Sequence, residues 1–571
     1  MNLKILGRKM IKKRYLSSII AGLLVVSGCN KQNDDIGKAR TISSDESAMV
    51  ASAVFSTSQA TENLAFAKQQ YLKMISHVEK GENLTQSSSC ADATEMICVP
   101  RSQEHDGIFM EQPKKWTNGF FPGALWKLLS AKSQINFSAE EEAKLYQTAQ
   151  YYQATLYSEA TRGTTHDLGF ILYDSFGEAL SYDALSDELR VRYQQALETG
   201  RATLANRYGD EQGVIRSWDW IPRMRITTIE NGEAVANRYT LSNPWTYPVI
   251  VDNMMNLEYL FDSDSERYHE IAFNHAKNTA LNHYFYDEND TAQQFPLSYH
   301  VFDYGEFKPG NWQGVGNISA WARGQGWSLY GFVTVVEAMK NANIDLADYP
   351  DFEAHVHKLF GSIEHLLEDS LVPYWDFFAA RDNATDYAEN VSTDTAVFSG
   401  ILALCDKDIE QNLKPYHGYR PMTLNASMMS QESLARLEGK VGRHGEVILQ
   451  GDKLLPCGTQ PYPESHTKIP RDTSAAAIYA AALYRYALFT DNMTDKQKFA
   501  ELADSIMAEL TANYRTDRTK NGRPNSFEYG FVLAEATGDM GKGSELDTPI
   551  IYGDFYFIEA NILKIALEGS L

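Results

Sequence analysis

The fold of this chain is decided by the stretch Pro248-Val-Ile-Val-Asp252-Asn-Met-Met-Asn256-Leu-Glu-Tyr-Leu-Phe261. A helix with this sequence is apolar around most of its circumference, so we expect it to be enclosed on nearly all sides. Asp252 nevertheless lies near its start, and Asn256 follows one turn later on the same face. A carboxylate in such a helix is unfavourable unless it is paired or hydrogen-bonded. Capping of the helix start is one explanation for Asp252. A functional role for the carboxylate is the other explanation, and it is favoured because several other helices of the chain share this design.

Helical periodicity and capping residues extend along most of the chain. They predict about twelve helical segments, at roughly 60–79, 119–132, 139–157, 168–182, 187–205, 249–262, 265–283, 320–341, 351–368, 472–490, 495–513 and 554–568. Segments with a charged face, such as 140–152 and 495–507, alternate with segments that are apolar most of the way round, such as 473–483 and 555–563.

This alternation indicates the architecture. A helix that is polar on one side lies on a surface, whereas a helix with little polar face is enclosed. Six outer and six inner helices would form a double ring, so the sequence predicts an all-α fold, an (α/α)6 toroid or barrel with long loops. A helical solenoid is the main competing architecture, but no repeat of fixed period is visible.

The composition narrows the choice of partners. A chain of 571 residues with a formal net charge of -23 can build a large core. The charge argues against nucleic acid and anionic membranes as partners. An anionic substrate would need a local cluster of hydrogen-bond donors, because the overall field would repel it.

The N-terminus has the pattern of a targeting segment. Basic residues precede the apolar run 19–26, which is too short for a stable membrane anchor and is followed by Ser27-Gly28-Cys29. Small residues before a cysteine resemble a bacterial lipobox, which would make Cys29 the lipidated first residue. An ordinary signal peptide with an incidental cysteine is the alternative. We expect an exported bacterial lipoprotein, periplasmic or associated with the outer membrane.

The domain layout follows from these segments. We predict a lipoprotein signal peptide at 1–28, a flexible tether at 29–58 and the toroid at 59–571, with an insertion at about 378–470. The insertion contains a possible short helix at 393–404.

The four remaining cysteines permit disulfides in an exported chain. The local pairings are Cys90 with Cys98 and Cys405 with Cys457, and free thiols are also compatible with the sequence. The spacing of Cys and His residues indicates no metal site.

Polar and aromatic residues gather at the starts of the inner segments, at 116–122, 165–170, 252–253, 321–327, 471–472 and 552–554. If the inner helices run parallel, these starts converge on one mouth of the ring. Aromatic side chains with carboxylates and a few cations suit a sugar, which is apolar on its faces and polar at its edge.

Each of these residues also has a structural interpretation. Thr165 and Asp167 could cap the helix from 168, His166 could be a structural histidine, and Arg323 could pair with a carboxylate. The tryptophans Trp116, Trp321 and Trp327 could belong to the core, and we interpret Asp472 and Asp554 as helix caps. A functional site is favoured because a core has no need of polar groups at six helix starts.

An ordered set of motifs resembles the unsaturated glucuronyl hydrolases, glycoside hydrolase family 88. The motifs are Trp116-Thr-Asn-Gly-Phe-Phe-Pro-Gly123, His166-Asp-Leu-Gly-Phe170, Val251-Asp-Asn-Met-Met-Asn256, Ser298-Tyr-His300, Ser319-Ala-Trp-Ala-Arg-Gly-Gln-Gly-Trp327, Pro373-Tyr-Trp-Asp376, Arg471-Asp-Thr-Ser-Ala-Ala-Ala477 and Tyr552-Gly-Asp-Phe-Tyr556. The resemblance runs from about 60 to 568, interrupted by the insertion. It implies an (α/α)6 barrel without a metal or organic cofactor.

The resemblance also implies a reaction. Polysaccharide lyases leave a C4=C5 double bond on the terminal uronic acid, and enzymes of this family remove that sugar by hydrating the double bond. Asp252 matches the general acid/base and Asp167 the second essential carboxylate. The substrate-binding candidates are Trp116, His166, Asn253, His300, Gln313, Arg323 and Trp327, of which Trp116 and Trp327 match stacking residues.

Two other functions compete with this one. The first is an unsaturated rhamnogalacturonyl hydrolase acting on pectin fragments, and the second is a non-catalytic glycan-binding surface lipoprotein on the same toroid. The motifs at 116–123 and 321–325 favour the glucuronyl group. The presence of both Asp167 and Asp252 favours an enzyme.

Overall fold

The computed structural model describes the chain from residue 55 to residue 569, with gaps. The gaps are 92–95, 105–106, 220–222, 231–232, 243–244, 287–294, 311–312, 315–319, 343–348, 368–369, 378–423, 426–445, 451–452, 457–469, 519–525, 540–544 and 546. The predicted signal peptide and lipidation at Cys29 therefore lie outside the described residues. So do the possible helix at 393–404 and the cysteines Cys405 and Cys457.

Six helical units of the described chain form a closed inner ring. In ring order they are α3 (Phe120–Ser130, preceded by the 3-10 turn η1, Trp116–Gly119), the π-helix η3 (Gly169–Gly177), the 3-10 turn η4 (Val251–Met255) with α6 (Asn256–Phe261), α8 (Ala322–Ala342), α14 (Thr473–Phe489) and α16 (Ile551–Gly569). Each unit packs against the next, and α16 packs back against α3.

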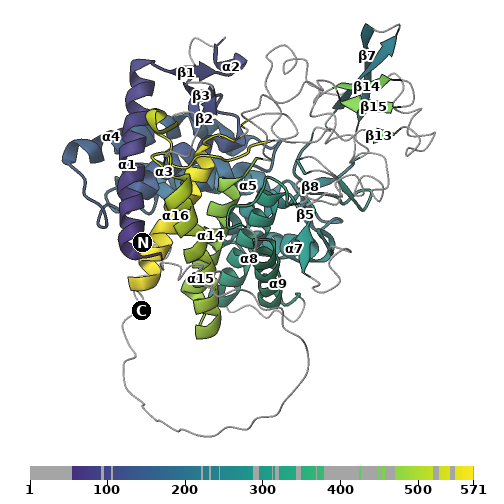
Figure 1. The fold of residues 1–571 in the computed structure, drawn as a ribbon. Coiled ribbons are helices and arrows are strands. Elements are labelled where there is room, and N and C mark those ends of the chain that lie inside the picture. Colours follow the sequence, from purple (N-terminus) through teal and green to yellow (C-terminus); the bar gives the residue numbers. More distant parts are fainter. Residues whose placement is uncertain are drawn as a thin grey trace, which may run out of the picture.

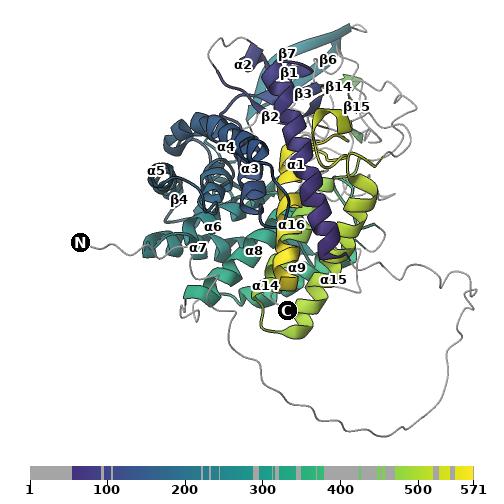
Figure 2. The same ribbon diagram turned by 90° about the vertical axis from the view of Figure 1, so that its left-hand side faces the viewer.

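Six further helices cover this ring from outside. They are α1 (Thr57–Lys80), α4 (Ala139–Gln153), α5 (Asp187–Ala205), α7 (Glu266–Asn282), α9 (Phe352–Leu366) and α15 (Met493–Glu509). Each packs on one inner unit. Figures 1 and 2 show α1 beside α16, so the first outer helix covers the last inner helix. The predicted (α/α)6 toroid is confirmed, and a closed ring is not a solenoid.

The two kinds of helix differ in burial as their sequences predict. In α14, small residues such as Ala476 and Ala480 are fully buried and let α8 and α16 approach closely. The outer helix α4 begins with a capping box, in which Ser138 and Glu141 each bond the other's backbone N–H. It buries only the stripe that faces α3, including Leu145.

The two aspartates interpreted as caps behave differently. Asp472 is the N-cap of α14, and its carboxylate accepts the N–H of Ser474 at 3.1 Å. The interpretation of Asp554 as a cap is wrong, because α16 already begins at residue 551. The Asp554 carboxylate instead accepts the N–H groups of Val532 at 3.0 Å and Leu533 at 2.9 Å. It thereby ties the segment before α16 to the helix.

The long connections contain short strands where the sequence predicted only loops. They form three small sheets around the ring: β1 (Leu84–Gln86), β3 (Gly107–Glu111) and β2 (Val99–Glu104); β4 (Tyr208–Gly209) with β5 (Val214–Ile215); and β9 (Tyr284–Tyr286) with β10 (Pro296–Ser298). A fourth, three-stranded antiparallel sheet has the order β12 (Lys308–Gly310), β11 (Val301–Asp303), β8 (Pro248–Ile250), and β8 leads directly into η4.

The predicted insertion contributes strands to a fifth sheet. Here β6 (Arg223–Glu230) and β7 (Glu233–Ser242) join β13 (Leu424–Asn425), β15 (Lys453–Pro456) and β14 (Glu446–Gln450) in the order β13-β15-β14-β6-β7 (Figure 1). Strand β14 pairs in parallel with β6. The insertion and the connection before Asp252 are thus joined by backbone pairing.

Shorter elements complete the described chain. They are α2 (Ser88–Ala91), η2 (Ala154–Thr161), η7 (Leu510–Tyr514) and η8 (Ser526–Tyr529). Cys90 and Cys98 form a disulfide, which is one of the local pairings that the sequence allowed. Within the described part of the chain, no helix combines the length and apolarity needed to cross a membrane.

Candidate active site

Asp252 lies in the first turn of η4 beside a histidine that directly precedes strand β11. The N-cap residue of η4 is Ile250, so Asp252 is not its cap. Strands β8 and β11 pair antiparallel with Val301 opposite Ile250, which brings His300 next to Asp252. The His300 Nε2 atom lies 3.1 Å from Asp252 Oδ2, and Asp252 is only 7% exposed.

Asp167 lies just before η3 and is held by its two sequence neighbours. The hydroxyl of Thr165 donates to Asp167 Oδ2 at 2.5 Å, and His166 Nε2 lies 3.3 Å from Asp167 Oδ1. The Gly169 N–H, which a capping carboxylate at 167 would accept, donates to Asn256 Oδ1 instead, so the Asp167 side chain is not a cap. The side chain of Asp167 is 21% exposed and is therefore accessible at the end of the helix.

His166 connects the two carboxylates. It is completely buried, and burial lowers the pKa of its imidazole. The negative charges of Asp167 and Asp252 oppose this effect. The inner segments carrying Asp167 and Asp252 meet here, because the Gly169 N–H, two residues after Asp167, donates to Asn256 Oδ1, four residues after Asp252, at 2.8 Å.

An aromatic cluster lies next to these carboxylates. The half-buried ring of Trp116 lies 5.3 Å from Phe170 and 5.0 Å from Tyr552, measured between centroids. Trp116 therefore keeps an exposed surface on which a sugar can stack. Trp327 is 0% exposed and packs between Phe170 and Tyr556 at 5.1 and 5.4 Å. Its predicted stacking role is corrected to a core role, since a fully covered ring offers no face to a ligand.

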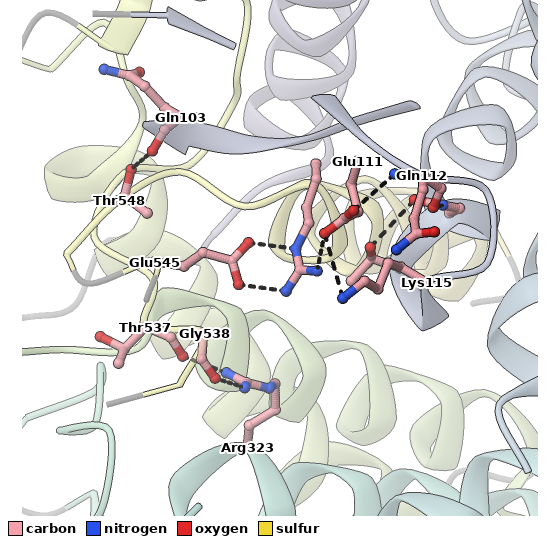
Figure 3. Close-up of polar contacts among 12 residues, drawn as sticks. Gln103, Glu111, Gln112, Lys115, Arg323, Thr537, Gly538, Glu545 and Thr548 are labelled. Carbon is pink, nitrogen blue, oxygen red and sulfur yellow. Dashed lines mark hydrogen bonds and ion pairs between the residues drawn. The ribbon is translucent and has the colours of Figure 1, made fainter. Parts of the chain in front are cut away.

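Arg323 is bonded within the protein (Figure 3). Its Nη1 donates to Asp472 Oδ2 at 2.8 Å and to the Thr537 carbonyl at 2.6 Å, and its Nη2 donates to the Gly538 carbonyl. The same Gly538 carbonyl accepts a bond from Gln313 Nε2 at 3.3 Å. The structural alternative, a pairing of Arg323 with a carboxylate, is therefore what the structure contains.

The structure adds a charged network that sequence reasoning missed. Arg101 donates to both oxygens of Glu545, at 2.7 and 2.8 Å, and lies 3.4 Å from Glu111. Lys115, which directly precedes Trp116, lies 3.7 Å from Glu111 (Figure 3). Arg101 and Glu545 are 444 residues apart, so no local pattern connects them.

The site thus brings together Asp167, Asp252, His166, His300 and Asn253, with Trp116 nearby, while Gln313 and Arg323 bond the segment that precedes α16. Among the residues that the structure describes, no three His, Cys, Asp or Glu side chains are placed to hold a metal ion. The arrangement offers two carboxylates, each beside an imidazole, next to a partly exposed aromatic ring. Such a set can transfer protons to and from a bound sugar.

Comparisons with known proteins agree in sequence and in fold. No protein-family model matches the chain. The chain is 27% identical over 460 residues to an unsaturated glucuronyl hydrolase of Formosa agariphila, covering 78% of this chain and 79% of the relative. It is 25% identical over 346 residues to an unsaturated chondroitin disaccharide hydrolase of Streptococcus pyogenes serotype M1, covering 58% of this chain and 72% of the relative.

Solved structures share the fold. An unsaturated glucuronyl hydrolase specific for heparin superposes with a TM-score of 0.57 at 23% identity, covering 90% of this chain and 98% of the other. The unsaturated glucuronyl hydrolase of Bacillus sp. GL1 gives a TM-score of 0.54 at 17% identity, covering 89% and 96%. The resemblance indicated by the sequence motifs is confirmed.

Proposed function

We propose that this chain, a relative of the unsaturated glucuronyl hydrolases, removes the terminal Δ4,5-unsaturated uronic acid from lyase-generated glycosaminoglycan-type oligosaccharides. The reaction is hydration of the C4=C5 double bond. The observation that carries the proposal is the meeting of the segments that carry Asp167 and Asp252, which the hydrogen bond from the Gly169 N–H to Asn256 Oδ1 joins beside the buried His166. Both carboxylates lie at the starts of inner units, and the ring of Trp116 lies 5.3 Å from Phe170, three residues after Asp167.

Asp252 has the general acid/base role in this proposal. Its protonated carboxyl donates to C4, and the positive charge that develops at C5 is shared with the ring oxygen. The carboxylate that remains takes a proton from water as the water oxygen bonds to C5. The resulting hemiketal opens to a C5 ketone, and the hemiacetal left at C1 releases the rest of the oligosaccharide. His300, 3.1 Å from Asp252, orients the carboxyl for both steps.

Asp167 has a substrate-holding role, and the fully buried His166, which was predicted to bind the substrate, supports Asp167 from within the protein. The Thr165 hydroxyl and the His166 imidazole fix the Asp167 carboxylate, whose partial exposure leaves it able to accept bonds from sugar hydroxyls. Because burial lowers the pKa of His166, a neutral imidazole is favoured here. A neutral imidazole has one donor and one acceptor nitrogen, so this fully buried ring can donate to the Asp167 carboxylate but offers no nitrogen to the sugar.

The other candidate residues either contact the sugar or hold the site in place. Trp116 stacks on the apolar face of the sugar. Asn253, Gln313, Arg323 and Trp327 support the site from behind, because their polar groups or ring faces are engaged within the protein.

The experiment that tests this function follows ultraviolet absorbance. The C4=C5 bond is conjugated with the carboxylate and absorbs, and hydration removes that signal. Unsaturated chondroitin, hyaluronan and heparin disaccharides should lose absorbance with the wild-type protein. If the folded protein leaves all of them unchanged, and pectin-derived substrates lose absorbance instead, the glucuronyl assignment is wrong. No change on either class would favour a glycan-binding protein.

We also propose export and lipid anchoring at Cys29, with the membrane contacted only through the lipid. The basic residues, the short apolar run and Ser27-Gly28 before Cys29 support this. Metabolic labelling with a fatty-acid analogue should mark the wild-type protein and leave a Cys29→Ala variant unmarked. Equal labelling of the two would contradict the anchor.

A further inference from the structure

The segments that carry Asp167 and Asp252 are joined by one buried amide. Asn256, at the start of α6, is 1% exposed. Its Oδ1 accepts the N–H of Gly169 at 2.8 Å, two residues after Asp167. Its Nδ2 donates to Oδ1 of Asn253 at 2.7 Å, one residue after Asp252. The side chain of Asn256 therefore spans the two inner units without being assigned any role in substrate contact.

The hydrogen bonds continue from Asn253 to an outer helix. Asn253 Nδ2 donates to the Ile215 carbonyl at 2.6 Å, and the Ile215 N–H donates to Nδ1 of His275, in α7, at 3.0 Å. The series of bonds from Gly169 through Asn256 and Asn253 to Ile215 has a backbone group at each end, and these two groups fix the direction of the bonds between them. The Gly169 N–H can only donate, and the Ile215 carbonyl can only accept. Both amides therefore have one orientation that satisfies them.

Glycine at 169 allows the two units to approach. A Cβ atom at this position would lie 2.6 Å from Asn256 Oδ1 and 3.3 Å from the Met255 carbonyl. A side chain at this position would displace the Asn256 amide or move the start of η3 away from Met255 and Asn256. The short separation between these units is thus built into the backbone.

Ser217 makes a second connection between the two segments, in addition to the Asn256 side chain. The Ser217 carbonyl accepts the His166 N–H at 3.1 Å, and the Ser217 hydroxyl oxygen accepts the Ile250 N–H at 2.9 Å. Ser217 is 0% exposed. The residues before both carboxylates are therefore held by the same segment, so the two sides can only separate if buried bonds break.

We propose that Asn256 is a positioning residue that sets the separation of the Asp167 and Asp252 carboxylates. This inference rests on the proposed function, because it assigns that reaction a residue that touches neither the sugar nor the two carboxylates. Hydration needs one carboxylate at C4 while the other holds the hydroxyls of the same sugar. A displacement of about 1 Å is enough to lower turnover by about a hundred-fold.

The test exchanges one atom of the amide. Asn256→Asp preserves size but replaces the donor Nδ2 with an oxygen that faces Asn253 Oδ1. We expect kcat to fall at least about ten-fold at neutral pH, with a smaller change in KM. Lowering the pH protonates the introduced carboxyl, which can then donate again, so the ratio of variant to wild-type rate should rise toward acid pH. A ratio that stays constant with pH would overturn the proposal, as would an unchanged kcat.

Asn561→Asp is the matched control. Asn561 is 0% exposed in the inner helix α16, its Nδ2 donates to the Phe557 carbonyl at 2.7 Å, and its Oδ1 accepts from Asn63 at 3.0 Å. The exchange there breaks similar buried bonds away from the site. The control should lower the thermal unfolding midpoint and leave kcat of the folded protein unchanged. An equal fall in kcat in both variants would mean that Asn256 acts only through stability.

Crystal structures provide a measurement that does not depend on activity. The carboxylate separation should differ by at least about 0.5 Å between wild type and Asn256→Asp, the tolerance of a preorganised site. An unchanged separation overturns the proposal, whether or not the substrate is the proposed one. If Asn256→Asp does not fold, Gly169→Ala provides the same displacement, and the same two outcomes apply. If the wild-type protein turned over none of the substrates, only the proposed function would be refuted, and the positioning role of Asn256 would still be tested by the carboxylate separation.

Discussion

The ion pair between Arg323 and Asp472 yields a quantitative prediction. The two side chains are 1% and 0% exposed, and Arg323 Nη1 lies 2.8 Å from Asp472 Oδ2. An Arg323→Met variant keeps the length of the side chain but leaves Asp472 as a buried carboxylate without its cation. The Thr537 carbonyl loses its Arg323 donor as well, and the Gly538 carbonyl keeps only its bond from Gln313.

The size of the effect follows from this burial. Removing one member of a buried ion pair lowers the free energy of unfolding by about 3 to 5 kcal/mol. Globular proteins have an unfolding entropy of about 2.1 cal/mol/K per residue, so the unfolding entropy of a domain of roughly 500 residues is about 1 kcal/mol/K. The unfolding midpoint of Arg323→Met should therefore fall by about 3 to 5 °C.

The assay is thermal unfolding, measured beside a matched control and beside substrate kinetics. Arg267→Met removes an ion pair between Arg267 and Asp210, whose side chains are 51% and 83% exposed, respectively. This variant should change the unfolding midpoint little. The reasoning is refuted if Arg323→Met unfolds like the wild type and yet loses affinity for the substrate. That result would mean that the guanidinium faces the sugar, as the family resemblance implies.

Three further predictions concern single side chains. Asp252→Asn should keep the wild-type unfolding midpoint and lower kcat at least about a hundred-fold; a near-normal rate would identify a different acid. Trp116→Ala should raise KM up to about ten-fold, whereas Trp327→Ala should mainly lower stability, by about 3 to 5 kcal/mol, and the opposite pattern would contradict the two placements. Burial lowers the pKa of His275 to about 3, below the unfolded value of about 6.5. The stability that the neutral His275 contributes is present above pH 6.5 and is lost as the pH falls toward 3. The variant His275→Asn keeps an acceptor for the Ile215 N–H, so its unfolding midpoint should fall less steeply with decreasing pH than that of the wild type. An unchanged slope would contradict the assignment.

Helix patterns in the sequence predicted the architecture well because they are local. Whether a helix is polar on one side or apolar all round decides its layer, and the boundaries of α5 and α9 fall within two residues of those predicted. The clustering of polar residues at the starts of the inner helices follows from the closed ring. The meeting of Asp167 and Asp252 is a consequence of that ring and of their places in the chain.

Strands and long-range pairs were missed for a different reason. Strands β6 and β7 flank Asn231-Gly232, a strong hairpin signal, but a parallel partner from residues 446–450 leaves no trace nearby in the sequence. The pairing of Arg101 with Glu545 depends on tertiary structure in the same way. The core position of Trp327 depends on what lies against its ring, which the motif at 321–327 does not encode.

Asp554 shows how burial overrides a local signal. An aspartate near a helix start is usually a cap, yet here the helix begins earlier and the carboxylate bonds a neighbouring segment. Burial, partly opposed by the two backbone N–H donors, raises the pKa of Asp554 to about 8. Neither the backbone donors nor the enclosure can be deduced from the residues beside it.

The order of chemical events is the most direct test of the account. Proton nuclear magnetic resonance in D2O, recorded during turnover of an unsaturated disaccharide, follows the C4 vinyl proton and the released sugar together. The account predicts that the vinyl signal disappears no later than the aglycone is released, with deuterium added at C4 in one configuration, and that Asp252→Asn abolishes both. Release of a free sugar that still contains its C4=C5 bond would contradict hydration and point to attack at the glycosidic carbon.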